Sequence, residues 1–352
     1  DSYALSSNSF IETTLTYALS YIAAINSNNT SLDPCEITII ADTDYYSHTP
    51  QPLQVYPSFC SFNVPLSAAH KTGLGSSASL VTALTAALLI HYIPNFDISN
   101  DTYQSQLHNL AQVAHCAAQG KIGSGFDIAA AVYGTCIYRR FSPRILASIS
   151  EPGTACFKER LKSIINDSKA IWDFEIQKQN AIMPIGWELV MCDVDCGSST
   201  VSMVKRVLEW RKDNSMMASV IWEKLQQLQE ILLAQLKACD APGVRKSLEG
   251  IRQQVRIMSD MSGVPVEPAE QTALLDAVIL NVRGVIGGVI PGAGGYDAVV
   301  FLVRDYEATI KDLAAFLQEW IADKGGKIKL LRSKSVPDGV KLENYENYTA
   351  NL

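Results

Sequence analysis

The stretch Lys71–Ser79 reads Lys-Thr-Gly-Leu-Gly-Ser-Ser-Ala-Ser and runs directly into an apolar segment that continues to about Ile93. Closely spaced glycines let backbone N–H groups approach an anion, and the first turn of a helix adds free donors and a positive dipole end. The stretch therefore predicts a phosphate-binding loop at the start of a helix. A hydroxyl of Ser76 or Ser77 could also reach Mg²⁺, since hydroxyl oxygen suits this hard cation. The alternative, weighed evenly, is a plain glycine turn before a buried helix.

The order of residues excludes the commonest nucleotide-binding loop. A P-loop places its lysine after the last glycine, whereas Lys71 precedes both glycines. The chain also has no G-x-G-x-x-G opening a dinucleotide-binding unit. The loop therefore predicts a phosphate site of another class.

The composition is that of a globular protein acting on small molecules. The 352 residues predict two domains, and 47% hydrophobic with 18% charged residues argue against disorder. A net charge of −7 argues against nucleic acid or a membrane surface as partner, and no apolar run reaches membrane-spanning length. The eight cysteines are scattered without a C-x-x-C pair, which favours reduced thiols in a cytoplasmic enzyme.

Hydrophobic periodicity predicts a mixed α+β chain with a boundary near residue 185, dividing it into domains 1–184 and 185–352. Asn8 or Ser9 is the expected cap of the first helix, and Gly120 is the expected end of the third. We expect helices over 10–25, 77–92, 98–119, 127–133, 199–210, 218–239, 244–261, 267–280 and 306–324. We expect strands over 35–41, 136–141, 171–177, 187–193 and 327–331, and further strands around a glycine loop within 284–303.

Two more glycine-rich segments stand at the ends of elements. Residues 119–127 read Gln-Gly-Lys-Ile-Gly-Ser-Gly-Phe-Asp. Asp127 could position or deprotonate an attacking oxygen, but a helix N-cap is the more frequent role of such a residue by about two to one. Residues 290–297 read Ile-Pro-Gly-Ala-Gly-Gly-Tyr-Asp, which predicts a loop pressed against another backbone or a ligand, or else a tight turn.

Together these segments resemble the GHMP kinases, and within them the phosphomevalonate kinases of fungal and plant type. The resemblance rests on HKTGLGSSASLVTALTAALL, HNLAQVAHCAAQGKIGSGFDIAAAVYG, YRRFSP and VIPGAGGYDAVVFL, and it covers nearly the whole chain. It implies a two-domain α+β GHMP kinase fold, with a ribosomal-S5-like N-terminal domain and a ferredoxin-like C-terminal domain. It also implies ATP-dependent phosphorylation of (R)-5-phosphomevalonate to 5-diphosphomevalonate with Mg²⁺, in the mevalonate route to isoprenoids and sterols.

The resemblance assigns roles residue by residue. It implies that Asp127 and Lys71 are catalytic, at opposite ends of one triphosphate, and that Ser77 is the Mg²⁺ ligand. The ATP phosphate loop would comprise Gly73, Leu74, Gly75, Ser76, Ser77 and Ala78. The acceptor site would include Lys121, Ser124, Gly125, Gly292, Ala293, Gly294 and Gly295.

Further cations and hydroxyls are candidates for the acceptor phosphate. Arginine suits a phosphate because it binds with two parallel donors. Arg139 and Arg140 are neighbours on a predicted strand, so only one can face the site and the other is expected in a surface ion pair. Ser199 opens a predicted helix and could bind an anion or simply cap it. The histidines have no metal-ligand spacing, and His108 and His115, seven apart on one helix, predict a polar face.

One motif of these kinases is missing here. They carry a P-G-K motif near the N-terminus, and this chain has no match to it, so its N-terminal domain is expected to be partial. Two alternatives stay open: another GHMP kinase such as mevalonate kinase, and an impaired fragment that only binds nucleotide. The expected partners are ATP and phosphomevalonate, and the expected state is a monomer.

Overall fold

The computed structural model describes residues 7–26, 32–46, 59, 71–166, 171–178, 183–194, 200–304, 306–331, 333 and 335–351. The described residues fall into two compact units. Unit 1 draws on Asp1–Ile40, Gly75–Ala181 and Val336–Leu352, and unit 2 on Ala41–Leu74 and Ile182–Ser335. The division into 1–184 and 185–352 stays a prediction.

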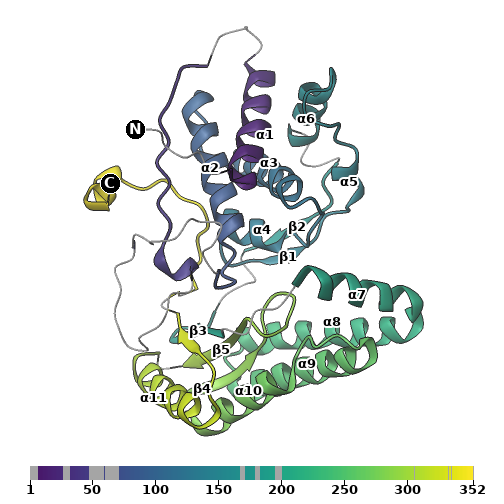
Figure 1. Cartoon of the computed structure of the whole chain (residues 1–352), viewed down its shortest axis with the longest axis vertical. Coiled ribbons are helices and arrows are strands. Elements are labelled where there is room, and N and C mark those ends of the chain that lie inside the picture. The colour runs from purple at the N-terminus through teal and green to yellow at the C-terminus, as the bar shows by residue number, and fades with distance from the viewer. Residues whose placement is uncertain are drawn as a thin grey trace. The chain divides into compact units, whose positions relative to one another are not determined.

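Unit 1 is mainly helical (Figure 1). Its helices are α1 (Ser9–Ile25), α2 (Ser76–Tyr92), α3 (Asp101–Gln119), α4 (Phe126–Tyr133), α5 (Arg144–Ala147) and α6 (Phe157–Asn166). Two short antiparallel strands, β1 (Ile137–Arg139) and β2 (Glu175–Gln177), complete it with the 3-10 helix Tyr345–Asn351. Helices α1, α2 and α3 pack on one another around one hydrophobic core.

Local sequence explains where these helices begin and end. The Asn8 side chain accepts hydrogen bonds from the amides of Phe10 and Ile11, which confirms it as the N-cap of α1. Gly120 ends α3 in the left-handed conformation, also as expected. Only one narrow stripe of α2 is exposed, at Ala83, Ala87 and His91, so its nearly continuous apolar sequence reflects burial on most sides.

Unit 2 is built on one antiparallel sheet in the order β4-β5-β3-β6. Its strands are β3 (Trp187–Val194), β4 (Val285–Val289), β5 (Ala298–Arg304) and β6 (Ile328–Leu330). Chain order is strand, helices, two strands, helix, strand. This order and pairing form a ferredoxin-like sheet, which confirms that expectation.

Helices cover both faces of this sheet. The helices that pack on it are α9 (Ala241–Ser262), α10 (Ala269–Asn281) and α11 (Tyr306–Lys324). Two more helices, α7 (Thr200–Asp213) and α8 (Ser215–Lys237), pack on α9, and a 3-10 turn spans Thr43–Tyr45. Val299, Phe301 and Val303 of β5 pack in one core with α10 and α11, whereas Leu302 packs with α9. Because alternate residues of a strand point to opposite faces of the sheet, α9 covers the face opposite to that covered by α10 and α11.

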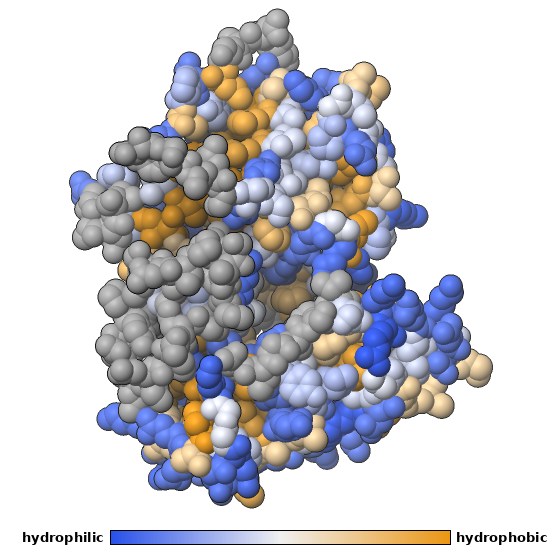
Figure 2. Space-filling model, viewed as in Figure 1, coloured by the Kyte–Doolittle hydropathy of each residue, from blue (hydrophilic) through white to orange (hydrophobic). Residues whose placement is uncertain are grey.

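The strand predicted over 35–41 is wrong. Residues 32–42 form no strand, and Ile37 and Ile39 are 41% and 46% exposed. Hydrophobic side chains reach the surface in the part of Figure 2 where α1 and α2 lie. A strand needs a hydrogen-bonded neighbour, and the described residues pair no strand with this segment. The strand predicted over 171–177 likewise shortens to β2.

Candidate active site

The first part of the site is the start of α2. Gly75 is its N-cap, with φ 76° and no side-chain cap. The first hydrogen bond of the helix runs from Ser79 N to Gly75 O, so the amides of Ser76, Ser77 and Ala78 have no acceptor within the helix. Ala78 is 1% exposed, so it can offer a ligand only its backbone. This arrangement is suited to an anion, as the sequence predicts.

The second part is the start of α4, which carries Asp127. The N-cap is Gly125, with φ 77°, and it has no side-chain cap. The interpretation of Asp127 as N-cap is therefore wrong: it lies in the first turn, where one carboxylate oxygen, Oδ1, accepts a hydrogen bond from the amide of Ile128 at 3.0 Å. Its side chain keeps 27% exposure. A partly exposed carboxylate at a helix start is available to a ligand.

His115 of α3 lies between these two helix starts. Its Nε2 is 3.1 Å from the hydroxyl oxygen of Ser77, and its Nδ1 is 3.8 Å from Oδ2 of Asp127. The side chain of Gln119 places its amide nitrogen 2.9 Å from Nε2. The residue is 3% exposed, and its ring lies 5.6 Å from that of Phe10 between centroids. The structure thus brings Ser77 and Asp127 to one buried imidazole.

A second set of buried polar groups on α3 supports Gly125. The amide nitrogen of Gln112 donates to the carbonyl of Gly125 at 2.7 Å and lies 3.1 Å from Nε2 of His108. Nδ1 of His108 is 3.3 Å from Oδ1 of Asn109. Burial lowers the pKa of His108 to about 4, so its ring is neutral.

The polar face predicted for His108 and His115 is wrong, because both are buried. The side-chain partners of His108 lie within α3, whereas His115 meets Ser77 of α2 and Asp127 of α4 only in the folded chain. A sequence signal was present: polar residues recur at positions 108, 112, 115 and 119 within the stretch 107–119, where Asn109 is the only other polar residue.

The two neighbouring arginines have different partners. Arg139 of β1 forms an exposed ion pair with Glu175 of β2 at 3.1 Å. Arg140 donates to the carbonyl of Ile122 at 3.3 Å, in the loop between α3 and α4. That loop also carries the exposed residues Lys121 and Ser124. Arg140, rather than Arg139, thus contacts the loop that carries Lys121 and Ser124.

Lys71 belongs to unit 2. It pairs with Tyr46 through an isolated antiparallel bridge and is exposed. The next residue, Thr72, is fully buried and donates its hydroxyl hydrogen to the carbonyl of Asp44 at 2.6 Å. These bonds fix the backbone just before Gly73 and Leu74.

The glycine loop 292–295 packs on another backbone segment, as the sequence predicts. Gly295 N donates to the carbonyl of Val266 at 2.9 Å. Gly294 has φ 82°, and a Cβ there would lie 2.4 Å from the Val266 carbonyl oxygen. Only glycine therefore fits at Gly294, which has Ala293 as its neighbour.

Buried charges hold the segment on which this loop rests. Arg252 and Glu267 are ion-paired at 2.8 Å, and Gln271 donates to the carbonyl of Tyr296 at 2.8 Å. Burial alone would lower the pKa of Arg252, but its bonds to Glu267 and Asp276 raise it. Residues outside the three predicted motifs therefore decide where the loop 292–295 lies.

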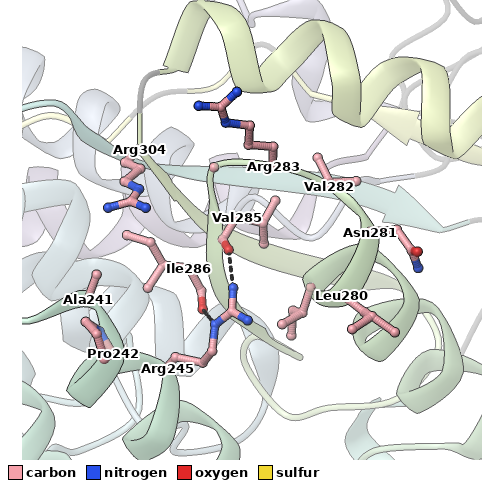
Figure 3. Close-up of a pocket in the computed structure, with 12 residues that line it drawn as sticks. Ala241, Pro242, Arg245, Leu280, Asn281, Val282, Arg283, Val285, Ile286 and Arg304 are labelled. Carbon is pink, nitrogen blue, oxygen red and sulfur yellow. Dashed lines mark hydrogen bonds between the residues drawn. The ribbon is translucent and has the colours of Figure 1, made fainter.

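Unit 2 also has a cavity of about 540 Å³, which the loop 292–295 does not line (Figure 3). It is bordered by the start of β4 and the end of β5, and Arg245 donates there to the carbonyls of Val285 and Ile286. The loop 292–295 joins the opposite ends of the same strands. The cavity is therefore separate from the predicted acceptor-site loop.

Ser199, a predicted acceptor-site residue, lies outside the described residues. Among the residues that the structure describes, no group of three or more His, Cys, Asp or Glu side chains could hold a metal ion. Within the same residues, no helix combines the length and apolar character needed to cross a membrane.

Comparison with known proteins decides the family. Residues 47–135 match the model of the GHMP kinase N-terminal domain. The phosphomevalonate kinase of Gibberella zeae is 49% identical over 345 residues, which are 97% of this chain and 77% of that protein. The chain belongs to the phosphomevalonate kinase family. The family member from Aspergillus fumigatus is 45% identical over 97% of this chain and 75% of its own length.

Two solved structures are similar in fold to this chain. The phosphomevalonate kinase of Streptococcus pneumoniae matches with a TM-score of 0.58 at 18% identity, over 93% of this chain and 82% of that one. The Lin0012 protein of Listeria innocua matches with a TM-score of 0.65, also at 18% identity, over 95% and 83%. The expected α+β GHMP kinase fold is thereby confirmed.

Proposed function

We propose that the chain transfers the γ-phosphoryl group of ATP to (R)-5-phosphomevalonate, giving ADP and 5-diphosphomevalonate. Membership of the phosphomevalonate kinase family supports the reaction. The observation that carries it in this chain is the meeting of two helix starts at His115, one offering free amides and Ser77 and the other Asp127.

The proposed reaction needs little help from a general base. An acceptor phosphate is largely ionised at neutral pH, because its second pKa is near 6. One of its oxygens attacks the γ-phosphorus in line, and the bond from phosphorus to the β,γ-bridging oxygen breaks. Asp127 then orients the acceptor rather than removing a proton, and the α2 amides hold the phosphates of ATP. Lys71 is proposed to offset the charge that develops on transfer.

The donor set fits Mg²⁺. The Ser77 hydroxyl and the Asp127 carboxylate are hard oxygen ligands, and phosphate oxygens and water would complete the coordination. When bound, the ion neutralises charge on the phosphates. Arg140, Lys121 and Ser124 are proposed to bind the phosphate already on the acceptor, together with the loop 292–295 and Ser199.

Competition between acceptors tests the proposal. ADP formation is measured with MgATP and either phosphomevalonate or mevalonate, and nucleotide affinity is measured alongside. We expect turnover with phosphomevalonate and none with mevalonate. Turnover with mevalonate alone would support another GHMP kinase, and nucleotide binding without turnover would support the impaired-fragment alternative.

Two further properties are proposed. The six cysteines that the structure describes are all free thiols, which supports the cytoplasm as the compartment. A monomer is the simplest state for this function, and the molar mass in solution tests it.

A further inference from the structure

We propose that His115 is a positioning residue that holds the Ser77 hydroxyl and the Asp127 carboxylate in one fixed arrangement for phosphoryl transfer. The inference rests on the proposed function, because it assigns a role within that site. None of the three predicted motifs includes this residue.

The two ring nitrogens of His115 face different groups. The Ser77 hydroxyl oxygen lies 3.1 Å from Nε2, and the Gln119 amide nitrogen, a donor, lies 2.9 Å from Nε2 and 3.4 Å from Nδ1. Nδ1 faces the Asp127 carboxylate at 3.8 Å. The proposed role therefore assigns the acceptor to Nε2 and the ring proton to Nδ1. The imidazole thus accepts a hydrogen bond at Nε2, on the side of Ser77, and presents an N–H donor at Nδ1, on the side of Asp127.

This arrangement constrains both functional groups. A Ser77 hydroxyl that donates to Nε2 keeps its oxygen lone pairs for a ligand. Oδ1 of Asp127 is held by the Ile128 amide, and Oδ2 faces Nδ1 at 3.8 Å, so both oxygens are oriented. The 3.8 Å separation exceeds a direct hydrogen bond, and such contacts often tighten when substrate binds.

Burial makes the arrangement rigid. The imidazole is 3% exposed and lies against Phe10, in the C-terminal part of α3, a helix that packs on α1 and α2. The amides of α2 and the cations of the acceptor site do not depend on the ring. Removing it should therefore disturb the orientation of the reacting groups more than the binding of either substrate.

Three variants of the full chain test this role by kinetics. His115→Phe keeps a ring beside Phe10 and removes both nitrogens, whereas His115→Gln restores an amide acceptor and donor. Tyr21→Phe is the control: it deletes a different, partly buried hydrogen bond of unit 1, that from Tyr21 to Asn166 at 2.6 Å. We expect His115→Phe to lower kcat by about 10- to 100-fold with each KM changed less than about threefold, His115→Gln to recover part of kcat, and Tyr21→Phe to keep it.

A readout without turnover separates this inference from the proposed reaction. Long-range ¹H–¹⁵N spectra of the histidine rings, assigned with His115→Phe, should show His115 protonated on Nδ1, with shifts that respond to Ser77→Ala and to Asp127→Asn. Protonation on Nε2, or an unchanged kcat in folded His115→Phe, would overturn the inference. An inactive wild-type chain whose His115 shows the expected spectrum would instead overturn the proposed reaction and leave the link between Ser77 and Asp127 standing.

Discussion

The guanidinium of Arg252 and the carboxylate of Glu267 lie 2.8 Å apart, and each side chain is only 1% exposed. Arg256 and Thr272 donate to the same oxygen of Glu267 at 2.9 Å and 3.0 Å. The preceding residue, Val266, accepts the hydrogen bond from Gly295. A buried ion pair thus lies beside the backbone that supports the predicted acceptor-site loop.

Glu267→Gln should destabilise unit 2 by about 3 kcal/mol, because it leaves the buried positive charge of Arg252 with weaker compensation. The urea midpoint of unfolding measures this loss. Glu175→Gln is the matched control, since it breaks the exposed pair with Arg139 and should cost less than about 1 kcal/mol. Equal midpoints for the two variants would show that the buried Arg252–Glu267 pair contributes no more to stability than the exposed pair does.

Gly294→Ala should weaken binding of the acceptor. Its Cβ would lie 2.4 Å from the Val266 carbonyl oxygen, so the loop 292–295 must move. We expect KM for phosphomevalonate to rise at least about tenfold, with a strain cost of about 1–3 kcal/mol. Gly292→Ala is the control: it also has positive φ, but nothing lies within 4 Å of its Cβ. A similar KM for both variants would remove the steric argument.

Arg140→Ala should raise KM for phosphomevalonate by about tenfold or more, because a charge-assisted hydrogen bond to phosphate contributes roughly 1.5–3 kcal/mol. Arg139→Ala should leave KM nearly unchanged, since that side chain pairs with Glu175. Steady-state kinetics with varied acceptor distinguishes the two arginines. The reverse ranking would place Arg139 in the site.

Asp127→Asn should lower kcat by about 100-fold or more while ATP affinity stays near that of the wild type. The amide keeps the shape of the side chain and its bond from Ile128, but loses the negative charge that we propose is needed to position the reacting groups. Turnover and nucleotide titration are measured on the same preparation. Near-normal turnover would refute the role of Asp127.

His108 should make stability depend on pH. Its folded pKa of about 4 lies below the ordinary value of 6.5, so the unfolded chain binds more protons between these values. Stability therefore falls as the pH is lowered from about 6.5 toward 4, by up to about 1.4 kcal/mol per pH unit. Unfolding midpoints between pH 5 and 7 measure the slope. His108→Gln should flatten it, and His91→Gln, at an exposed histidine, should not.

The sequence by itself determined most of the helices and the positions of the glycine loops. Apolar periodicity and capping residues are local signals, so Gly120 was identified correctly and Asn8 was one of the two expected N-caps. The prediction of a strand over 35–41 was wrong because a strand also needs a hydrogen-bonded neighbour, which apolar composition alone does not supply.

Only the tertiary structure decided how the site is assembled. It decided that His115 and His108 are buried and that Arg139 and Arg140 have separate partners. It also decided that Gly294 contacts Val266. These contacts join residues that are distant in the chain, so their order in the sequence does not predict them. A side chain's chemistry depends on its neighbours in space, and in unit 1 the packing of α3 against α2 and α4 sets those neighbours.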